Sequence, residues 1–348
     1  MSASITDVRG ALTMISPVPF NAEAPLAALA GEVTPTALHY VRSNFPFPAH
    51  DGSLTLGGAV GNPMTLTLAD LRALPASERT VTLECAGNGR LGQTPLPAGE
   101  PWGRFAVSTA RWRGVPLHLV LRQASPSPDG VEVAFQGADH GRYGHHEDIA
   151  YVRSLAVSHA SDPAADILIA YEMNGEPLST EHGAPFRLVV PGWYGMASVK
   201  WLRWINVITA PYEGEFQTHH YMYHHDGFSE PVTRMHVRAR ITDPAPGSAI
   251  QAGTYRVRGK AWSGAGPVTN VDVSLTGEGE WYAAELEPPR GPYHWQDWSF
   301  EWRSATVGRH SLRARATDAA GHIQPEVPPW NRLGYGNNAI EVQYVDVY

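Results

Sequence analysis

Short runs of apolar, β-branched and aromatic residues recur along the first two thirds of the chain, and most are bounded by Gly, Pro or Asp. Such runs are typical of β-strands, so we expect strands at 54–56, 80–83, 131–135 and 186–190. Two segments have helical apolar spacing instead: residues 68–74, which end at Pro75, and residues 115–123, which carry Pro116 near the first turn. This part of the chain is therefore predicted to be a mixed α and β domain.

After residue 240 the pattern changes to alternation with a period of two residues, in segments 255–262, 271–275, 298–302 and 311–316. Turn residues separate these segments, and no helical spacing is found, which predicts a small antiparallel sandwich of the immunoglobulin type. The first 40 residues, rich in Pro, Ala and Asn, are expected to form an extended surface arm. The predicted fold class is thus α+β, with an arm over 1–40, a mixed domain over 41–235 and a sandwich over 236–348.

Composition narrows the class of protein. Hydrophobic residues make up 43% of the 348 positions and charged residues 17%, as in a folded globular chain. The net charge of −8 gives no reason to expect nucleic acid or an anionic membrane as a partner. The first 30 residues contain no basic stretch followed by an apolar core, and no segment is apolar for about 18 residues. We therefore expect a soluble cytoplasmic protein, or a periplasmic one if a leader was removed.

The single cysteine, Cys85, follows an apolar β-like run and opens a glycine-rich loop that ends on Arg90. A thiolate is a soft anionic donor that forms more readily near positive charge, which makes Cys85 a possible metal ligand. A lone cysteine is also often a buried thiol that packs as a small apolar group. The segment alone leaves both interpretations open.

Five basic residues fall in loops rich in small residues: Arg42, Arg90, His182, Arg187 and Lys200. If they converge, they form an anion pocket, because guanidinium groups match sulfate, phosphate and carboxylate oxygens and would favour the Cys85 thiolate. The alternative is that each is a solvated or structurally paired surface charge.

Histidines gather in two segments. His219, His220, His224 and His225 crowd one, and the other contains His140, His145 and His146 near Asp139 and Glu147. Such clusters suit zinc or copper, so a metal-binding protein without catalysis is a further hypothesis. Adjacent histidines point in different directions, however, and no carboxylate sits at the usual zinc-site spacing.

Several separated motifs then occur in the order found in one family. They are Cys85-Ala-Gly-Asn88 with Arg90, Ser108-Thr-Ala-Arg-Trp112, Ala170-Tyr-Glu-Met-Asn-Gly175, His182-Gly-Ala-Pro-Phe-Arg187, Val190-Pro-Gly192 with Val199-Lys-Trp-Leu202, and Ala261-Trp-Ser-Gly264. Over residues 17–348 the chain resembles the sulfite oxidase family of molybdenum enzymes. The resemblance implies a molybdopterin-binding catalytic domain over 41–235 and an immunoglobulin-like dimerisation domain over 236–348, and hence a homodimer.

The resemblance also implies roles for individual residues. Cys85 matches the cysteine that binds molybdenum beside the two dithiolene sulfurs of molybdopterin. The residues that match those holding the pterin and phosphate are His182, Arg187, Ser198 and Lys200, with Asp139 as a weaker match. Arg42, Arg90 and Trp102 match positions of the substrate pocket. The implied activity is oxidation of sulfite, or a related small sulfur oxyanion, to sulfate by oxo transfer.

The absence of a second cysteine excludes a covalent c-type haem and leaves no iron–sulfur spacing. We therefore expect no haem or iron–sulfur cluster in this chain. Electrons are expected to pass to a separate acceptor, and a cytochrome is one candidate.

The sequence departs from the family pattern at three positions. Asn44 stands where the family has a histidine that contacts the cofactor, and His225 stands where it has an active-site tyrosine, a part that Tyr221 or Tyr223 is also placed to take. Leu333 occupies the place of an arginine, so either Arg332 reaches into the pocket or the pocket lacks one charge. A pocket with three converging arginines favours a free dianion as the substrate, and a pocket with fewer arginines favours a neutral or tethered substrate. The alternative substrates are therefore a sulfane sulfur, a sulfoxide or nitrate.

Overall fold

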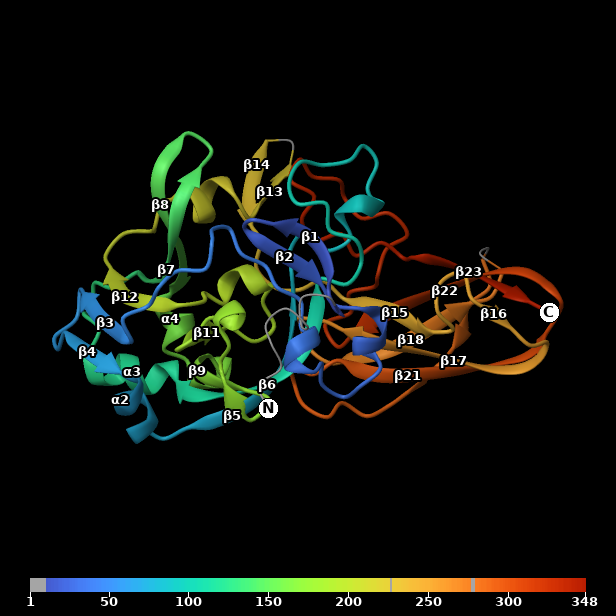
Figure 1. Cartoon of the computed structure of the whole chain (residues 1–348), viewed down its shortest axis with the longest axis horizontal. Coiled ribbons are helices and arrows are strands. Elements are labelled where there is room, and N and C mark those ends of the chain that lie inside the picture. Colours follow the sequence, from blue (N-terminus) through green and yellow to red (C-terminus); the bar gives the residue numbers. More distant parts are fainter. Residues whose placement is uncertain (1–10, 226, 277–278) are drawn as a thin grey trace.

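The computed structural model describes residues 11–225, 227–276 and 279–348. A mixed sheet and an antiparallel sheet lie on one side of the molecule, and a β-sandwich formed by the C-terminal third extends from them to the other side (Figure 1). Within the described residues, no helix is long and apolar enough to cross a lipid bilayer.

The first sheet has the strand order β4-β3-β12-β7-β8, in which β12 runs parallel to β3 and antiparallel to β7. Its strands are β3 (Ser53–Gly58), β4 (Met64–Thr67), β7 (Glu132–Tyr143), β8 (His146–Ala156) and β12 (Leu202–Ile208). The second sheet has the order β10-β9-β6-β5, with β11 also paired to β9. Its strands are β5 (Ser77–Glu84), β6 (Val107–Pro116), β9 (Leu168–Met173), β10 (Glu176–Pro177) and β11 (Arg187–Val189).

The helices are short. They are α2 (Leu68–Ala73), α3 (Leu117–Ala124), α4 (Val157–Ala160) and the single turns η1 (Leu26–Leu29), η2 (Thr36–Leu38), η3 (Arg90–Gly92), η4 (Pro163–Ala165), η5 (Thr180–His182), η6 (Gly195–Ala197) and η7 (Glu215–His219). Helix α2 begins with a capping box, in which the Thr67 hydroxyl accepts from the Asp70 backbone and the Asp70 carboxylate accepts from the Thr67 backbone. The predicted strands of the first two thirds and both predicted helices are confirmed, with ends shifted by a few residues.

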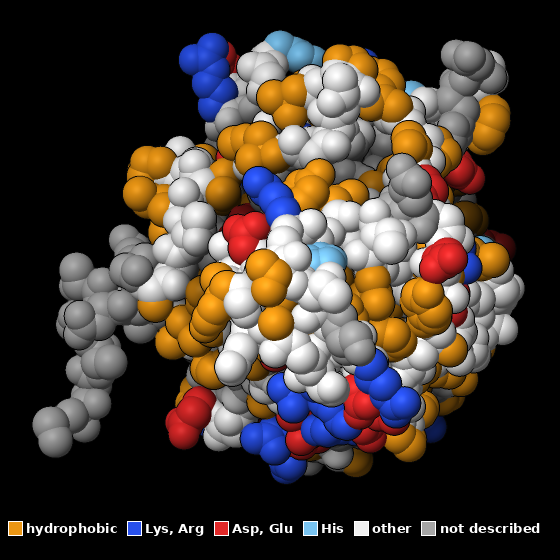
Figure 2. Space-filling model, turned by 90° about the vertical axis from the view of Figure 1, so that its right-hand side faces the viewer, with side chains coloured by type: hydrophobic (Ala, Val, Ile, Leu, Met, Phe, Trp, Pro, Cys, Tyr) orange, Lys and Arg blue, Asp and Glu red, His pale blue; other side chains and the backbone are white. Residues whose placement is uncertain are grey.

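The C-terminal sandwich consists of the sheets β15-β17-β21-β20 and β16-β23-β22-β18-β19. Their strands are β15 (Arg238–Asp243), β16 (Ala249–Ile250), β17 (Gly253–Trp262), β18 (Val268–Ser274), β19 (Tyr282–Ala283), β20 (Glu285–Leu286), β21 (Gln296–Ala305), β22 (Gly308–Asp318) and β23 (Val342–Val347). Alternate residues of these strands form one core that includes Val257, Trp298 and Leu312, as the period-two pattern predicts. Figure 2 views this end of the molecule and shows basic and acidic side chains gathered together on one side of it.

The described part of the predicted surface arm is more buried than expected. Strands β1 (Thr13–Pro17) and β2 (Phe20–Glu23) form a hairpin, and all four residues of β2 are buried. A backbone bridge between Ala22 and Val41 ties the hairpin to the segment that leads into the mixed domain. Leu12, Phe20 and Ala22 also form a small buried apolar cluster with Val41.

A buried ion-pair network joins the mixed domain to the sandwich. The carboxylate of Glu84, the last residue of β5, accepts from Arg238 Nη1 at 2.6 Å and from Trp262 Nε1 at 2.9 Å. It also accepts from Asn88 Nδ2 at 2.7 Å. Glu341 pairs with Arg238 at 3.1 Å and also with Arg240. Side chains of the sandwich therefore bind directly to Glu84, the residue before Cys85.

Candidate active site

Cys85 lies in the wall shared by two pockets. It directly follows β5, and its backbone N–H donates to Ala106 O at 2.8 Å while its carbonyl accepts from Asn88 N at 2.9 Å. Gly89 allows the chain to turn with φ of 83° before Arg90 begins η3. The Cys85 side chain is buried, yet it lines both pockets, and so do Arg42, Asn44 and Tyr221. The Cys85 residue is thus part of the wall of both pockets.

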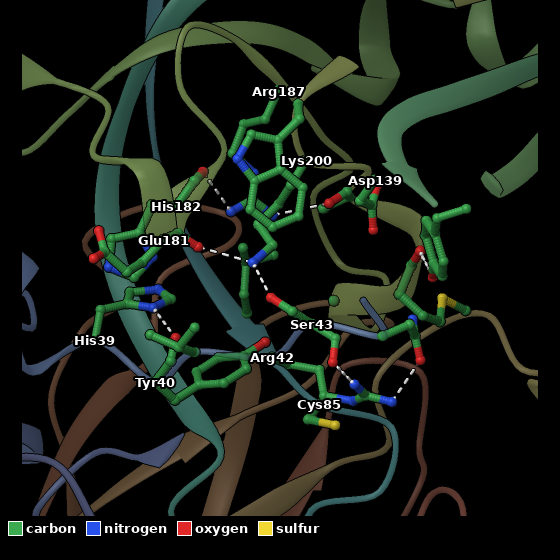
Figure 3. Close-up of a pocket in the computed structure, with 18 of the residues that line it drawn as sticks. His39, Tyr40, Arg42, Ser43, Cys85, Asp139, Glu181, His182, Arg187 and Lys200 are labelled. Atoms are coloured by element: carbon green, nitrogen blue, oxygen red, sulfur yellow. Dashed lines mark hydrogen bonds between the residues drawn. The ribbon is translucent and has the colours of Figure 1, made fainter. Parts of the chain in front are cut away.

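The first pocket holds about 660 Å³ of empty space, counting space open to solvent, and charged and polar residues line it together with apolar ones. The structure brings together here all the residues that the sequence predicts to hold a cofactor: Asn44, Cys85, Asp139, His182, Arg187, Ser198 and Lys200. Figure 3 shows Arg187, Lys200 and Asp139 at one end of this space and Arg42 and Cys85 at the other.

The buried cations of the first pocket are held by backbone and hydroxyl oxygens. Lys200 Nζ donates to Ser43 Oγ at 2.9 Å and to Glu181 O at 2.8 Å. Arg187 donates to the carbonyls of His182 and Ser198 at 3.2 and 2.9 Å. Burial lowers the pKa of Arg187 to about 10 and that of Lys200 well below its ordinary value. Because burial disfavours both charges, an anion bound between them would be stabilised.

Asp139 is the one acidic residue among the predicted cofactor ligands. Burial raises the pKa of its carboxyl to about 7, although the nearby Lys200 opposes this rise. Its Oδ1 is buried and has no hydrogen-bond partner within the described chain. A polar ligand in the first pocket would satisfy this atom.

Two buried histidines stand side by side in the first pocket, and the sequence predicted only one of them. The rings of His39 and His182 pack edge to face with centroids 5.0 Å apart. Burial lowers the pKa of His39 to about 3 and that of His182 well below its ordinary value, so both rings are neutral at pH 7. His39 Nε2 is buried with no partner in the described chain and thus offers a second polar atom to a ligand. Its signal in the sequence is only that it lies three residues before Arg42.

The second pocket opens on the other side of Cys85 and holds about 1050 Å³ of empty space, part of it open to solvent. The predicted substrate-pocket residues Arg42, Arg90 and Trp102 all line it. Aromatic residues absent from the prediction complete it: Tyr143 from the end of β7 and Tyr335 from the C-terminal part of the chain.

Arg90 is clamped by backbone oxygens. Nε and Nη2 donate to Leu333 O at 3.0 and 2.8 Å, and Nη1 donates to Glu100 O at 2.5 Å. A Cβ at Gly87 would lie 2.6 to 2.8 Å from the guanidinium, so only glycine leaves room for it. The cation is therefore fixed in position before any substrate arrives.

Arg42 is fixed by its own loop. It donates to Asn44 Oδ1 at 2.6 Å and to the carbonyl of Ser43. Burial by itself lowers the pKa of Arg42, but the ionisable groups of Tyr221 and Cys85 raise it overall. For Cys85 the effect of burial is larger than that of the neighbouring charges. Burial raises the pKa of its thiol, and the nearby Arg42 only partly opposes this rise.

Two of the predicted positions that the structure describes, Arg332 and Tyr223, do not line the second pocket. The side chain of Arg332 is exposed and does not line it, whereas Leu333 does. The backbone shift that would bring Arg332 inward is absent because Leu333 O is held by Arg90. Of the two tyrosines proposed as substitutes for the family residue, Tyr221 lines the pocket and Tyr223 does not. The side chain of His225 lies outside the described residues.

The histidine clusters do not form a metal site in the described part of the chain, where no group of three or more His, Cys, Asp or Glu side chains is arranged to hold an ion. His140 pairs with Asp148 at 2.7 Å on the surface. His220 lines the second pocket, and its Nδ1 lies 2.9 Å from Glu215 Oε1. The described histidines are thus divided between surface and pocket wall.

Comparison with known proteins matches both parts of the chain to described families. Residues 44–216 match the oxidoreductase molybdopterin binding domain, and residues 229–344 match the Mo-co oxidoreductase dimerisation domain. The mitochondrial sulfite oxidase of Mus musculus is 35% identical over 97% of this chain and 66% of its own length. The sulfite oxidase of Gallus gallus is 36% identical over 93% of this chain and 75% of its own.

A solved structure shares the fold over the whole chain. The sulfane dehydrogenase SoxCD from Paracoccus pantotrophus superposes with a TM-score of 0.84 and 28% identity, covering 99% of this chain and 90% of that one. The chain spans about two thirds of the length of the mammalian relatives. The fold that contains the two pockets, Cys85 and the sandwich is therefore shared with this solved structure.

Proposed function

Because this chain belongs to the sulfite oxidase family of molybdopterin oxidoreductases, we propose that it oxidises sulfite, or a related small sulfur oxyanion, and passes the electrons to a separate acceptor. The observation that carries the proposal is the position of Cys85. Cys85 lines both a pocket that contains Arg187 and Lys200 and a second pocket that contains Arg90. Its thiol would hold the metal of a molybdopterin cofactor whose organic part the residues of the first pocket would bind, and the residues of the second pocket would bind the substrate.

The residues of the first pocket fit a molybdopterin cofactor. Lys200 and Arg187 would bind its phosphate, because a dianion relieves the unfavourable burial of two cations. The unpartnered atoms Asp139 Oδ1 and His39 Nε2 would pair with polar groups of the pterin. When bound, the cofactor supplies the oxygen that is transferred to sulfur and takes up two electrons.

The residues of the second pocket would bind and orient the substrate. A sulfur oxyanion must lose water before it reaches the metal, and the guanidinium groups of Arg42 and Arg90 replace that water. Arg90 is already held at three N–H groups by backbone oxygens, so it need not reorganise when the anion binds. Trp102, which is almost fully buried, closes the wall behind them.

We also propose that the protein is a homodimer formed through the C-terminal sandwich. The match of residues 229–344 to a dimerisation domain supports this proposal. For electron transfer we propose a separate carrier, a cytochrome among the candidates, because one cysteine cannot hold a covalent haem.

Steady-state turnover of the molybdenum-loaded protein with sulfite and ferricyanide tests the activity. Arg90→Gln is expected to raise the KM for sulfite by about ten- to a hundred-fold, since a hydrogen bond to a charged group contributes roughly 1.5–3 kcal/mol. Arg142→Gln, which alters an exposed arginine on β7, is the matched control and is expected to leave the KM unchanged. An unchanged KM in Arg90→Gln would contradict the assigned role of the pocket.

Elemental analysis tests the metal independently. Molybdenum is expected near one atom per chain in the parent and to be lost in Cys85→Ala. Stoichiometric zinc or copper without molybdenum would overturn the proposal.

A further inference from the structure

The wall of the second pocket carries a small net charge. The charged side chains that line it are two arginines, Arg42 and Arg90, and one carboxylate, Glu100. Burial lowers the pKa of His220, which favours the neutral form of this ring. Nearby Arg332 lowers the same pKa, whereas Glu215 raises it. The lining thus balances about one negative charge on a ligand, rather than two.

Leu333 is an apolar residue of the same wall. Its carbonyl accepts two hydrogen bonds from Arg90, which fix the backbone at this lining position. The neighbouring Arg332 is exposed and does not line the pocket. No third arginine is therefore available among the residues that line this space.

Aromatic side chains make up much of the remaining surface. Tyr221 and Tyr335 stack with ring centroids 5.2 Å apart, and the Arg90 guanidinium lies 5.6 Å from the centroid of Tyr335. Tyr143 and Trp102 also line the pocket. Aromatic faces of this kind pack against apolar or aromatic groups, and they offer little to a fully hydrated inorganic ion.

The size of the pocket agrees with this composition. Its cavity volume of about 420 Å³ is within the range of pockets that bind organic molecules of drug size. A four-atom inorganic oxyanion would occupy only a small part of it. A substrate with an organic group attached to sulfur would use both the cations and the aromatic wall.

We propose that the preferred substrate of this pocket is an organic sulfinate, R–SO2⁻, with an aromatic or bulky apolar group R. This inference rests on the proposed molybdenum-dependent activity and names its substrate class. The reaction is R–SO2⁻ + H2O → R–SO3⁻ + 2 H⁺ + 2 e⁻. The sulfur lone pair forms a new S–O bond, water supplies the oxygen and loses two protons, and two one-electron acceptors such as ferricyanide take the electrons.

Turnover with three substrates tests the preference directly. Sulfite, methanesulfinate and benzenesulfinate are compared on the molybdenum-loaded protein with ferricyanide. The kcat/KM for benzenesulfinate is expected to exceed that for sulfite by at least about ten-fold, with methanesulfinate between them. An equal or higher value for sulfite would overturn the sulfinate inference and leave the proposed function intact.

Binding of the redox-inert products gives a second readout that does not need turnover. Calorimetry is expected to give a Kd for benzenesulfonate at least about ten-fold below that for sulfate. The reverse order would overturn the inference. If no substrate is oxidised, the proposed function fails, and the order of the two dissociation constants still decides what the pocket recognises.

A variant then tests the part played by Leu333. Leu333→Arg adds a cation to the wall and is expected to raise kcat/KM for sulfite relative to benzenesulfinate by about ten-fold or more. Leu96→Arg adds the same charge at an exposed position that does not line the pocket, and is expected to leave the ratio unchanged. An unchanged ratio in Leu333→Arg would refute the role of this residue in specificity.

Discussion

The ion pair between Arg238 and Glu84 predicts a large loss of stability when only one partner is removed. Both side chains are 2% exposed, and Nη1 lies 2.6 Å from Oε1. In Arg238→Met a side chain of similar length remains, but the Glu84 carboxylate keeps only its neutral donors from Asn88 and Trp262. Breaking one side of a buried pair costs about 3–5 kcal/mol, so we expect the free energy of unfolding to fall by that amount.

Guanidinium denaturation followed by tryptophan fluorescence measures this loss in the parent, Arg238→Met, Glu84→Gln and the double variant. The double variant is expected to be more stable than Arg238→Met alone, because it no longer buries an uncompensated charge. The coupling free energy from the cycle is expected to be at least about 1.5 kcal/mol.

The matched control is Arg258→Met on β17. Arg258 is 60% exposed and lies 3.5 Å from Asp243, so its removal is expected to change stability by less than about 1 kcal/mol. If Arg238→Met loses no more than this control, or if the two substitutions at Glu84 and Arg238 are additive, the reasoning about the buried pair is refuted.

Two further predictions concern the pockets. Gly87→Ala places a methyl group within 2.6 to 2.8 Å of the Arg90 guanidinium, and is therefore expected to raise the KM for the anionic substrate by about ten-fold with little change in thermal midpoint; an unchanged KM would contradict it. His39 has a pKa of about 3 in the folded protein against about 6.5 when unfolded, so its contribution is complete above pH 6.5 and is lost as the pH falls toward 3. Urea unfolding at pH 7 and at pH 5 measures the free energy of unfolding of the parent and of His39→Gln. Between these two pH values this free energy is expected to fall by about 2 kcal/mol less in His39→Gln than in the parent. Equal losses in the two proteins would refute the assignment.

The sequence predicted the strands well because their signal is local. Segments such as 255–262 and 311–316 alternate within a few residues, and the sandwich needs only this alternation to form its core. The arm was predicted less well. Ala22 and Phe20 are buried through contacts with residues some twenty positions away, and composition alone gives no sign of such contacts.

Most of the predicted cofactor residues that meet in the first pocket, such as Cys85, His182 and Lys200, were found through recognisable motifs, whereas Asp139 was a weaker match and Asn44 a departure from the family pattern. Residues outside the motifs were missed even where they line the same pockets. His39 and Tyr335 are examples, since they reach the site from the arm and from the C-terminal part of the chain. At Leu333 the sequence left two arrangements open, and in the structure Leu333 rather than Arg332 is among the residues that line the second pocket.

The hydrogen bonds from Arg238 and Trp262 to Glu84 limit how domains can be exchanged between this protein and its relatives. The two family matches end and begin at residues 216 and 229, which suggests an obvious crossover point for chimaeric enzymes. A graft made there would separate the Glu84 carboxylate from the cation that neutralises it and from the indole that donates a hydrogen bond to it. Exchange of the C-terminal third therefore requires a donor with matching groups at both positions, or a simultaneous change at Glu84.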